Sequence, residues 1–187
     1  MNAWYRRCGK RLGDLALALL CVGIAGGVGA GLMAIIRLTS PGPALLAQAR
    51  IGRAGRRFAF LKFRSMAEAD GRVTAIGRWL RATAMDELPQ LINILRGEMS
   101  FVGPRPLLPV EAEALARLPS GRARAALLPG LAGLTQRYAG KHPDPSVRLA
   151  LDMTYAARCG FWLDAWIIGC AVGTSVLGRW EPAGAAA

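Results

Sequence analysis

The chain has 187 residues, a length typical of one domain with a modest core. It is 53% hydrophobic and carries a formal net charge of +12, mostly from arginine. This excess indicates an anionic partner: nucleic acid, an anionic membrane surface or a phosphorylated substrate. Four scattered cysteines without a C-x-x-C pair argue against a disulfide framework or a zinc site. His142 is the only histidine, which excludes catalysis by a histidine pair, and it starts the sequence His142-Pro143-Asp144-Pro145 of an expected loop.

An uncharged apolar run from Leu15 to Ile36 is the first expected element. At roughly 22 residues, about 33 Å as a straight helix, it is long enough to cross a bilayer core and too long for a signal peptide. Basic residues flank it on both sides: Arg6, Arg7, Lys10 and Arg11 before it, and Arg37, Arg50, Arg53, Arg56 and Arg57 after it. Because basic flanks remain in the cytoplasm, this pattern favours a helix–break–helix hairpin that enters and leaves on one side.

Five glycines in the middle of the run permit two structures. They could supply the break of a re-entrant hairpin, because glycine weakens a helix interior. Alternatively, Gly23-x-x-x-Gly27 and Gly27-x-x-x-Gly31 have the spacing with which straight membrane helices pack on a partner. The charge pattern favours the re-entrant form, and the straight span stays open.

After the run, Ala44–Ile51 and Arg57–Phe63 alternate apolar and polar residues around Gly52-Arg53-Ala54-Gly55, which predicts a β-hairpin. The later elements are predicted as helices at Ala75–Ala82, Asp86–Arg96, Leu107–Leu118 and Ser146–Trp162, a turn at Pro129-Gly130, and an apolar stretch at Trp166–Leu177. At about twelve residues, that last stretch is too short to span a bilayer and suits the membrane interface.

Asp86-Glu87 stands out because the chain has only twelve acidic residues. Neighbours in a helix point about 100° apart, so the two carboxylates cannot share one face. They can have different roles, one attacking phosphorus and the other helping to hold a metal. The ordinary alternative is structural, since an Asp at the N-cap and acids in the first turn stabilise any helix.

Four cations lie in short segments that can converge on this helix start: Lys62, Arg64, Arg81 and Arg105. A diphosphate substrate needs several cations, and the arginine fork matches phosphate oxygens in pairs. Each cation taken alone has an alternative role on a solvated face or against lipid headgroups. A P-loop kinase or a Rossmann enzyme is not supported, because neither glycine-rich motif is present.

Three motifs resemble the bacterial sugar transferase family, whose members are monotopic polyprenyl-phosphate glycosyl-1-phosphate transferases. They are Lys62-Phe63-Arg64-Ser65-Met66, Asp86-Glu87-Leu88-Pro89-Gln90-Leu91, and the long block from Gly97 to Pro106. The later patterns of this family are matched by Pro129 to Gln136, by Asp152 and Tyr155, and by Trp162-Leu163-Asp164. The resemblance covers nearly the whole chain, from about Lys10 to Leu177.

The resemblance implies a mostly α fold with a small β-hairpin, in a monotopic membrane protein with a re-entrant N-terminal helix and interfacial helices. The expected division is a membrane-associated segment at 1–40, a catalytic domain at 41–182 and a tail at 183–187. The expected location is the bacterial inner membrane, with the active site facing the cytoplasm and membrane lipids as partners.

The resemblance also implies a reaction. Asp86 matches the nucleophile, Glu87 matches its partner, and both are expected to hold Mg²⁺. Arg81 and Arg105 match residues that contact phosphate or the nucleotide, and the convergence of cations described above adds Lys62 and Arg64 to the expected phosphate- or nucleotide-binding residues. The implied chemistry is ping-pong transfer of a sugar 1-phosphate from a UDP-sugar to polyprenyl (undecaprenyl) phosphate, with release of UMP.

Some positions depart from the family pattern. Many members break the first helix with a Ser-Pro pair, whereas this chain has no proline between Leu12 and Arg37. Gln136 to Gly140 also differs from the commoner version, and these departures leave the donor sugar open. The sequence also leaves the oligomeric state open, including a homo-oligomer. A nucleic-acid-binding role is disfavoured, because the aromatic residues cluster near apolar runs and the carboxyl pair would repel phosphates. The alternative function is a non-catalytic scaffold in a polysaccharide assembly complex.

Overall fold

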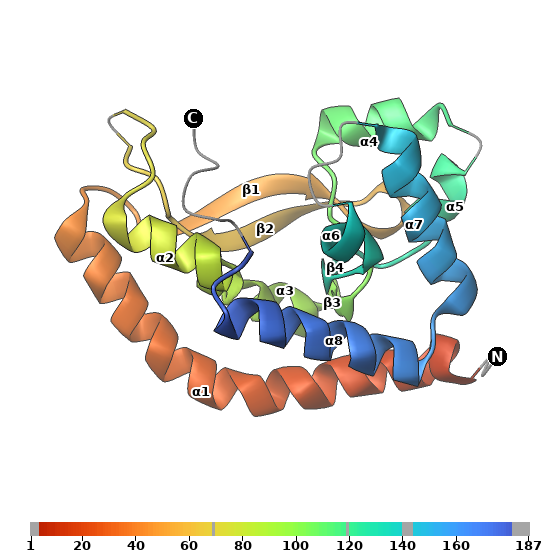
Figure 1. The fold of residues 1–187 in the computed structure, drawn as a ribbon, viewed down its shortest axis with the longest axis horizontal. Coiled ribbons are helices and arrows are strands. Elements are labelled where there is room, and N and C mark those ends of the chain that lie inside the picture. The colour runs from red at the N-terminus through yellow and green to blue at the C-terminus, as the bar shows by residue number, and fades with distance from the viewer. Residues whose placement is uncertain (1–3, 69, 119, 140–143, 181–187) are drawn as a thin grey trace.

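A computed structural model describes residues 4–68, 70–118, 120–139 and 144–180. Most of this part is helical, and its strands form two separate two-stranded sheets (Figure 1). The strands are β1 (Leu45–Ile51), β2 (Arg57–Phe63), β3 (Ser100–Val102) and β4 (Gly130–Ala132). The helices are α1 (Lys10–Thr39), α2 (Ala75–Thr83), α3 (Gln90–Arg96), α4 (Pro109–Ala116), α5 (Gly121–Ala125), α6 (Leu134–Tyr138), α7 (Pro145–Arg158) and α8 (Phe161–Val176). Short turns of other helix types are η1 (Tyr5–Gly9), η2 (Arg53–Gly55) and η3 (Met85–Glu87).

The mostly helical fold with a β-hairpin is thus confirmed, and the helices predicted at Ala75–Ala82 and Leu107–Leu118 correspond to α2 and α4. The loop predicted at His142 and the tail predicted at 183–187 lie outside the described residues.

The first helix has no break. α1 continues for 30 residues through all five glycines of the apolar run, so the predicted helix–break–helix shape is wrong as regards the break. Among those glycines, only Gly29 faces another side chain, where an added Cβ would lie 3.5 Å from Phe63. The other four face open space. Helical hydrogen bonding continues through them because the opposite side of α1 is held by tertiary packing.

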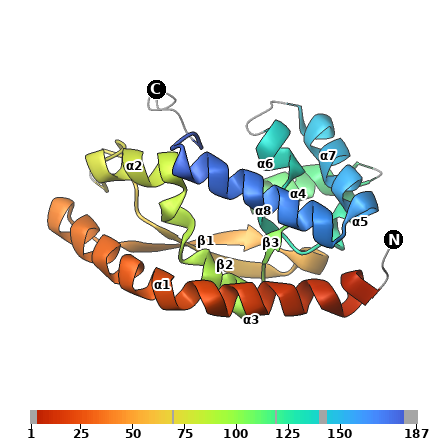
Figure 2. The same ribbon diagram turned by 60° about the horizontal axis from the view of Figure 1, so that its bottom comes forward.

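α1 lies along the rest of the molecule and curves around it (Figures 1 and 2). Near its start, Arg11 donates hydrogen bonds to the carbonyl oxygens of Ile94 and Leu95. Near its end, Ile36 packs in one cluster with Phe63 and Leu80. The buried residues along the helix recur on a single face, at Asp14, Ala18, Gly29, Leu32 and Ile36. α1 is therefore attached to the same domain at both ends.

The outward face of α1 is apolar. Leu19, Leu20, Ile24 and Leu38 are each between 65% and 86% exposed. Among the described residues, α1 is the one helix long and apolar enough to cross a membrane. A continuous exposed apolar face of this size marks a surface that contacts lipid or another protein.

The predicted hairpin is confirmed, with β1 and β2 paired antiparallel in the register Gln48↔Phe60. Its turn uses Gly55 at a φ of +73°, a left-handed conformation that favours glycine. Residues directly opposite each other share one face of an antiparallel sheet. One face of the hairpin therefore presents Gln48, Arg50, Phe60 and Lys62.

The helix predicted over Asp86–Arg96 is two elements. α2 ends at Thr83. The next residue, Ala84, has a φ of +56° and reverses the chain into the 3-10 turn η3, and α3 follows only at Gln90. Pro89 explains the division, because it has no N–H to donate to the Met85 carbonyl, which accepts from Leu88 instead at 3.3 Å. Asp86 consequently lies within η3 and caps neither η3 nor α3.

The second sheet was not predicted, since the sequence indicated only a turn at Pro129-Gly130. β3 and β4 pair parallel, with Val102 opposite Ala132. A side chain at Gly103 or Gly130 would collide with the backbone of the other segment. The two glycines thus allow the backbones to approach closely where β3 leads into the Gly103–Pro106 segment.

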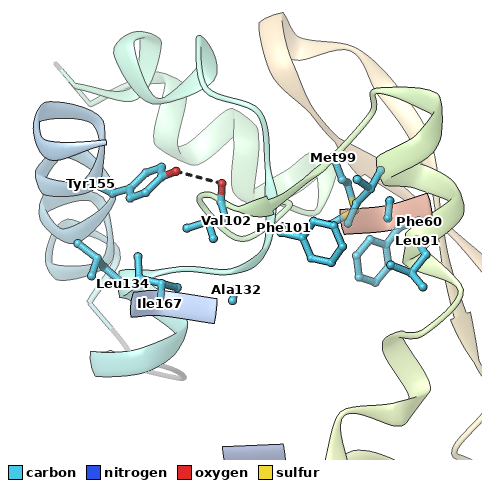
Figure 3. Close-up of a cluster of buried hydrophobic side chains, with 11 residues drawn as sticks. Phe60, Leu91, Met99, Phe101, Val102, Ala132, Leu134, Tyr155 and Ile167 are labelled. Carbon is cyan, nitrogen blue, oxygen red and sulfur yellow. Dashed lines mark hydrogen bonds between the residues drawn. The ribbon is translucent and has the colours of Figure 1, made fainter. Parts of the chain in front are cut away.

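The main core surrounds this second sheet (Figure 3). Phe101 and Val102 of β3 and the preceding Met99 fill it, and Ile167 reaches it from α8. Tyr155 enters the same cluster from α7, and its hydroxyl donates a 3.1 Å hydrogen bond to the Val102 carbonyl. The core therefore joins the C-terminal helices to the strand that leads into the Gly103–Pro106 segment.

The C-terminal helices are divided at Gly160 and not at the positions predicted. α7 ends at Arg158, and Gly160 is extended before α8 begins at Phe161, so the predicted helix Ser146–Trp162 is too long. This break turns Asp164 inward, where its carboxylate accepts hydrogen bonds from Lys10 and Tyr155 at 2.6 and 2.9 Å. α8 thereby connects to the start of α1. Its other side exposes apolar and aromatic side chains, including Phe161, Trp162, Trp166, Val172 and Val176.

Candidate active site

One large cavity of about 620 Å³ lies between the hairpin face, the η3 turn, the Gly103–Pro106 segment and helices α4, α6 and α7. Its charged lining residues come from six separate stretches of the chain: Arg50, Lys62, Arg81, Asp86, Glu87, Arg105, Glu111, Arg124, Arg148 and Asp152. Leucine side chains and Phe60 form the apolar parts of the wall. A cavity of this volume is within the range of small-molecule and cofactor sites.

Five of the six predicted site residues meet in this cavity: Lys62, Arg81, Asp86, Glu87 and Arg105. They come from β2, α2, η3 and the segment after β3. The convergence of separate segments that the sequence suggested is therefore seen in the structure.

Arg64 does not join them. Its side chain is buried and donates hydrogen bonds to the carbonyl oxygens of Ser40 and Pro41, which follow the end of α1. Arg64 thus fixes the exit of α1 against the hairpin. Because this position lies away from the cavity lining, we do not retain Arg64 among the phosphate-binding residues.

The two neighbouring carboxyl groups line the same cavity although they are adjacent in sequence. A 3-10 turn has about three residues per turn, and η3 places both side chains where the chain reverses after α2. Burial raises the pKa of Glu87 to about 7, Arg105 opposes this rise, and the neighbouring Asp86 adds to it. The helix-capping alternative for Asp86 does not hold, because neither cap position is Asp86.

The cations are held beside the carboxyl pair by both packing and hydrogen bonds. Burial lowers the pKa of Lys62, and the charge of Asp86 counteracts that effect. The Arg81 guanidinium donates a 2.9 Å hydrogen bond from Nε to the Ser65 hydroxyl, which orients it within α2. Cations and carboxylates in one partly buried cavity fit a substrate that carries several negative charges.

Arg50 is a cavity residue that the sequence reasoning missed. It stacks over the Phe60 ring, with its guanidinium carbon 5.4 Å from the ring centroid. Burial and the nearby Arg105 lower its pKa, and it donates a 3.3 Å hydrogen bond to the Pro106 carbonyl. The hairpin register would have identified it, since Arg50 lies on the same face as Lys62.

Arg124 and Asp152 form a second missed group, which supports the site. Arg124 Nε lies 2.6 Å from Asp152 Oδ2, and both side chains are buried. The same guanidinium donates a 2.7 Å hydrogen bond to the Arg105 carbonyl. Asp152 also accepts a hydrogen bond from the Thr135 hydroxyl. This chain of contacts from α7 and α6 fixes the backbone that carries Arg105.

The carboxyl pair fits a magnesium ion by its chemistry. Mg²⁺ prefers oxygen ligands and is commonly held by one or two carboxylates together with substrate phosphates and water. Asp86 and Glu87 supply two carboxylates on a cavity large enough for a phosphorylated substrate. Within the described ranges, no group of three or more histidine, cysteine or acidic side chains forms a complete protein cage for a metal.

Comparison with known proteins identifies relatives along most of the chain. A UDP-glucose:undecaprenyl-phosphate glucose-1-phosphate transferase of Caulobacter vibrioides is 42% identical over 151 residues, which are 71% of this chain and 57% of that protein. A UDP-N-acetylgalactosamine-undecaprenyl-phosphate N-acetylgalactosaminephosphotransferase of Aeromonas hydrophila is 31% identical over 90% of this chain and 44% of its own length. An Escherichia coli protein with the same name as the Caulobacter relative is 33% identical over 85% of this chain and 38% of that protein.

The chain thus spans about half the length of these curated relatives or somewhat less. The family model described as "Bacterial sugar transferase" matches residues 5–178, which include α1, both sheets and every charged residue of the cavity. The chain therefore belongs to the bacterial sugar transferase family.

Proposed function

We propose that this chain transfers a sugar 1-phosphate from a UDP-sugar to polyprenyl phosphate through a covalent intermediate on Asp86. The observation that carries the proposal is the shared cavity, in which Asp86 and Glu87 lie among Lys62, Arg81 and Arg105. The names of the relatives supply the substrate class, a UDP-sugar and undecaprenyl phosphate. A non-catalytic scaffold would not require two carboxyl groups and several cations on one cavity.

In the first half-reaction, a carboxylate oxygen of Asp86 attacks the phosphorus that carries the sugar. An oxygen–phosphorus bond forms, the bond from that phosphorus to the bridging oxygen breaks, and UMP leaves with the electron pair. Lys62, Arg81 and Arg105 stabilise the charge that develops on the phosphate oxygens. Because the site is partly buried, each of these charge interactions is stronger than it would be in water.

In the second half-reaction, a phosphate oxygen of the lipid carrier attacks the same phosphorus. The bond to Asp86 breaks, the carboxylate is regenerated, and the product is a polyprenyl diphosphate sugar. Covalent catalysis separates the encounter with a water-soluble donor from the encounter with a lipid acceptor. One cavity can therefore serve both substrates in turn.

Asp86 and Glu87 would hold Mg²⁺, which when bound would supply positive charge for the diphosphate of the donor. Glu87 binds a cation only when ionised. With a pKa raised to about 7, Glu87 becomes available as a ligand as the pH rises through neutrality.

We also propose that α1 and α8 attach the domain to one face of the inner membrane, with the cavity facing the cytoplasm. The start of α1 is bound to α3 through Arg11, and its end is bound to the hairpin through Arg64. If α1 crossed the bilayer upright, it would carry these parts of the catalytic domain with it. Contact of its outward apolar face with lipid leaves both ends of α1 on the same side, even without a break in the helix.

The function is tested by incubating membranes that contain the chain with UDP-glucose, UDP-N-acetylgalactosamine and other UDP-sugars, and measuring UMP with and without undecaprenyl phosphate. We expect continuous UMP release with one donor only when the carrier is present. Absence of carrier-dependent UMP release across the whole panel, from protein shown to be folded, would contradict the proposal.

A further inference from the structure

A second, smaller cavity of about 150 Å³ lies between α6 and α8, next to the large one. Arg137 from α6 and Arg179 from the segment after α8 supply its charge. Ile167 and Ala171 of α8 form an apolar wall, and Thr174 adds a hydroxyl group. Two cations beside an apolar wall suit a ligand with a phosphate at one end and a hydrocarbon chain at the other.

The two cavities share a wall, because Gln136 and Trp180 line both of them. Trp180 is held in place from two directions. Its backbone N–H donates a 3.1 Å hydrogen bond to the Ala82 carbonyl in α2, and its indole N–H donates a 2.7 Å hydrogen bond to the Ser175 hydroxyl. Ala82 lies just before the turn that carries Asp86. The shared wall therefore connects the small cavity with the segment that leads to the carboxyl pair.

The way in which α8 ends explains how Arg179 reaches the small cavity. Gly178 adopts a φ of +62°, and the Arg179 N–H donates a 3.0 Å hydrogen bond to the Thr174 carbonyl. This is the usual pattern of a helix that ends on a left-handed glycine. It folds Arg179 and Trp180 back toward the end of α8, so a cation from beyond α8 lines the same cavity as Arg137 of α6.

Aromatic residues flank two of the cavity-lining residues in sequence, since Tyr138 follows Arg137 and Trp166 precedes Ile167. Trp166 of α8 stacks on Tyr138 of α6, with ring centroids 6.4 Å apart, and both rings are exposed. Val172 and Val176 are exposed on the same helix, at 56% and 80%. Exposed tryptophan and tyrosine beside aliphatic residues are typical of the level of lipid headgroups.

We infer that the cavity between α6 and α8 is the entry subsite for the lipid acceptor, where Arg137 and Arg179 bind its phosphate monoester before it reaches Asp86. The inference rests on the proposed transferase function. The donor, which is soluble in water, has no need of the apolar wall of Ile167 and Ala171, whereas a polyprenyl phosphate presents both a phosphate and a long hydrocarbon chain. Arg137 and Arg179 are therefore specific for the second half-reaction.

The test separates the two half-reactions in the purified full chain in lipid nanodiscs. Donor alone should give the same burst of UMP in Arg137→Ala, Arg179→Ala and the wild type, because the first half-reaction does not use the small cavity. The KM for undecaprenyl phosphate should rise about tenfold in each variant and further in the double variant, since each loses one charge-assisted contact. Arg122→Ala is the matched control, since it removes the same charge from an exposed position on α5 outside both cavities.

An unchanged KM for undecaprenyl phosphate in the double variant, with the burst intact, would overturn the acceptor subsite. A lost burst in the variants, with a normal burst in the wild type, would also overturn it, because the arginines would then serve the donor. Phosphatidic acid, which carries the same phosphate monoester on an ordinary lipid, distinguishes carrier from headgroup: loss of its binding with an unchanged KM for undecaprenyl phosphate would assign the cavity to headgroups. A wild-type protein with no burst would instead contradict the proposed function itself.

Discussion

Asp164 and the Asp86-Glu87 pair are carboxyl groups placed among cations and hydroxyl groups, but their surroundings differ. Asp164 is 4% exposed and accepts hydrogen bonds from the hydroxyl groups of Tyr5 and Tyr155 and from the ammonium group of Lys10. Both of its oxygens are thus occupied by other parts of the chain. The pair on η3 lines a cavity of about 620 Å³ that can admit a substrate.

The difference shows what separates a carboxylate that anchors the fold from a pair that lines a cavity. At Asp164, partners from η1, α1 and α7 satisfy the charge, and these contacts join the start of α1 to the C-terminal helices. At Glu87, burial outweighs the nearby cations and the pKa rises to about 7. Carboxyl groups therefore stabilise the fold in one place and line a substrate-sized cavity in the other.

The largest expected effect is on turnover in Asp86→Asn. An amide is a very poor nucleophile toward phosphorus, so we expect steady-state UMP release to fall by about a thousandfold or more. The melting temperature should remain within a few degrees of the wild-type value, because Asp86 caps no helix. Near wild-type turnover in the folded variant would show that Asp86 is not the nucleophile.

Asp164→Leu should have the opposite profile. The substitution leaves Lys10 and two tyrosine hydroxyl groups without their partner, and we expect a loss of about 3 kcal/mol in unfolding free energy, measured by thermal or denaturant unfolding in detergent. Asp70→Asn is the control, because it breaks a surface pair with Arg72 in which both side chains are at least half exposed. Equal stability of the two variants would mean that the Asp164 network is not an anchor.

Arg105→Lys tests whether the cations act by geometry or by charge alone. Lysine keeps the charge but offers a point donor in place of a planar fork, so we expect kcat/KM for the donor to fall about tenfold. Arg105→Ala should lose considerably more. If Arg105→Lys retains full activity while Arg105→Ala does not, the planar guanidinium of Arg105 has no specific role beyond its charge.

Titration of Glu87 should make the stability of the protein depend on pH. Its pKa of about 7 in the folded protein lies above its ordinary value of 4.5, so the folded state binds more protons between these pH values. The stability contributed by this proton is complete below pH 4.5 and is lost as the pH rises through 7. The melting temperature of the wild type relative to Glu87→Gln should therefore decrease from pH 5 to pH 8, whereas the exposed Glu113→Gln should show no such trend.

Ionisation of Glu87, which lowers stability as the pH rises, should improve Mg²⁺ binding and so favour carrier-dependent turnover. Because an ionised Glu87 is the better Mg²⁺ ligand, the magnesium concentration needed for half-maximal activity should decrease as the pH rises through 7. A magnesium requirement that is the same at pH 6 and pH 8 would argue against Glu87 as a ligand.

Much of the site was predictable because the sequence patterns that indicate it lie within short segments of the chain. The hairpin follows from a two-residue alternation with glycines at its turn, and the carboxyl pair stands out in a chain with few acidic residues. What the sequence could not provide was the direction of individual side chains. Lys62 and Arg64 lie two residues apart, yet Arg64 is past the end of β2 and turns toward the exit of α1.

The features that the sequence did not predict depend on contacts between distant segments. β3 and β4 are three residues long, too short to show a periodic pattern, and they pair across about thirty residues. Arg124, which hydrogen-bonds to the Arg105 carbonyl, is held in place by an ion pair with Asp152, and no local motif links these two residues. The continuity of α1 likewise depends on packing along one face, which outweighs the weak helix propensity of five glycines.

Direct detection of the intermediate is the most direct test of the central claim that Asp86 carries the phosphosugar. The full chain is incubated with a UDP-sugar labelled in the sugar and in the adjoining phosphate, without carrier, and is quenched and digested for mass spectrometry. We expect release of about one UMP per active site and a phosphosugar adduct on the peptide that contains Asp86, removed by later addition of undecaprenyl phosphate. An adduct on another residue, or full carrier-dependent turnover by Asp86→Asn, would contradict the account.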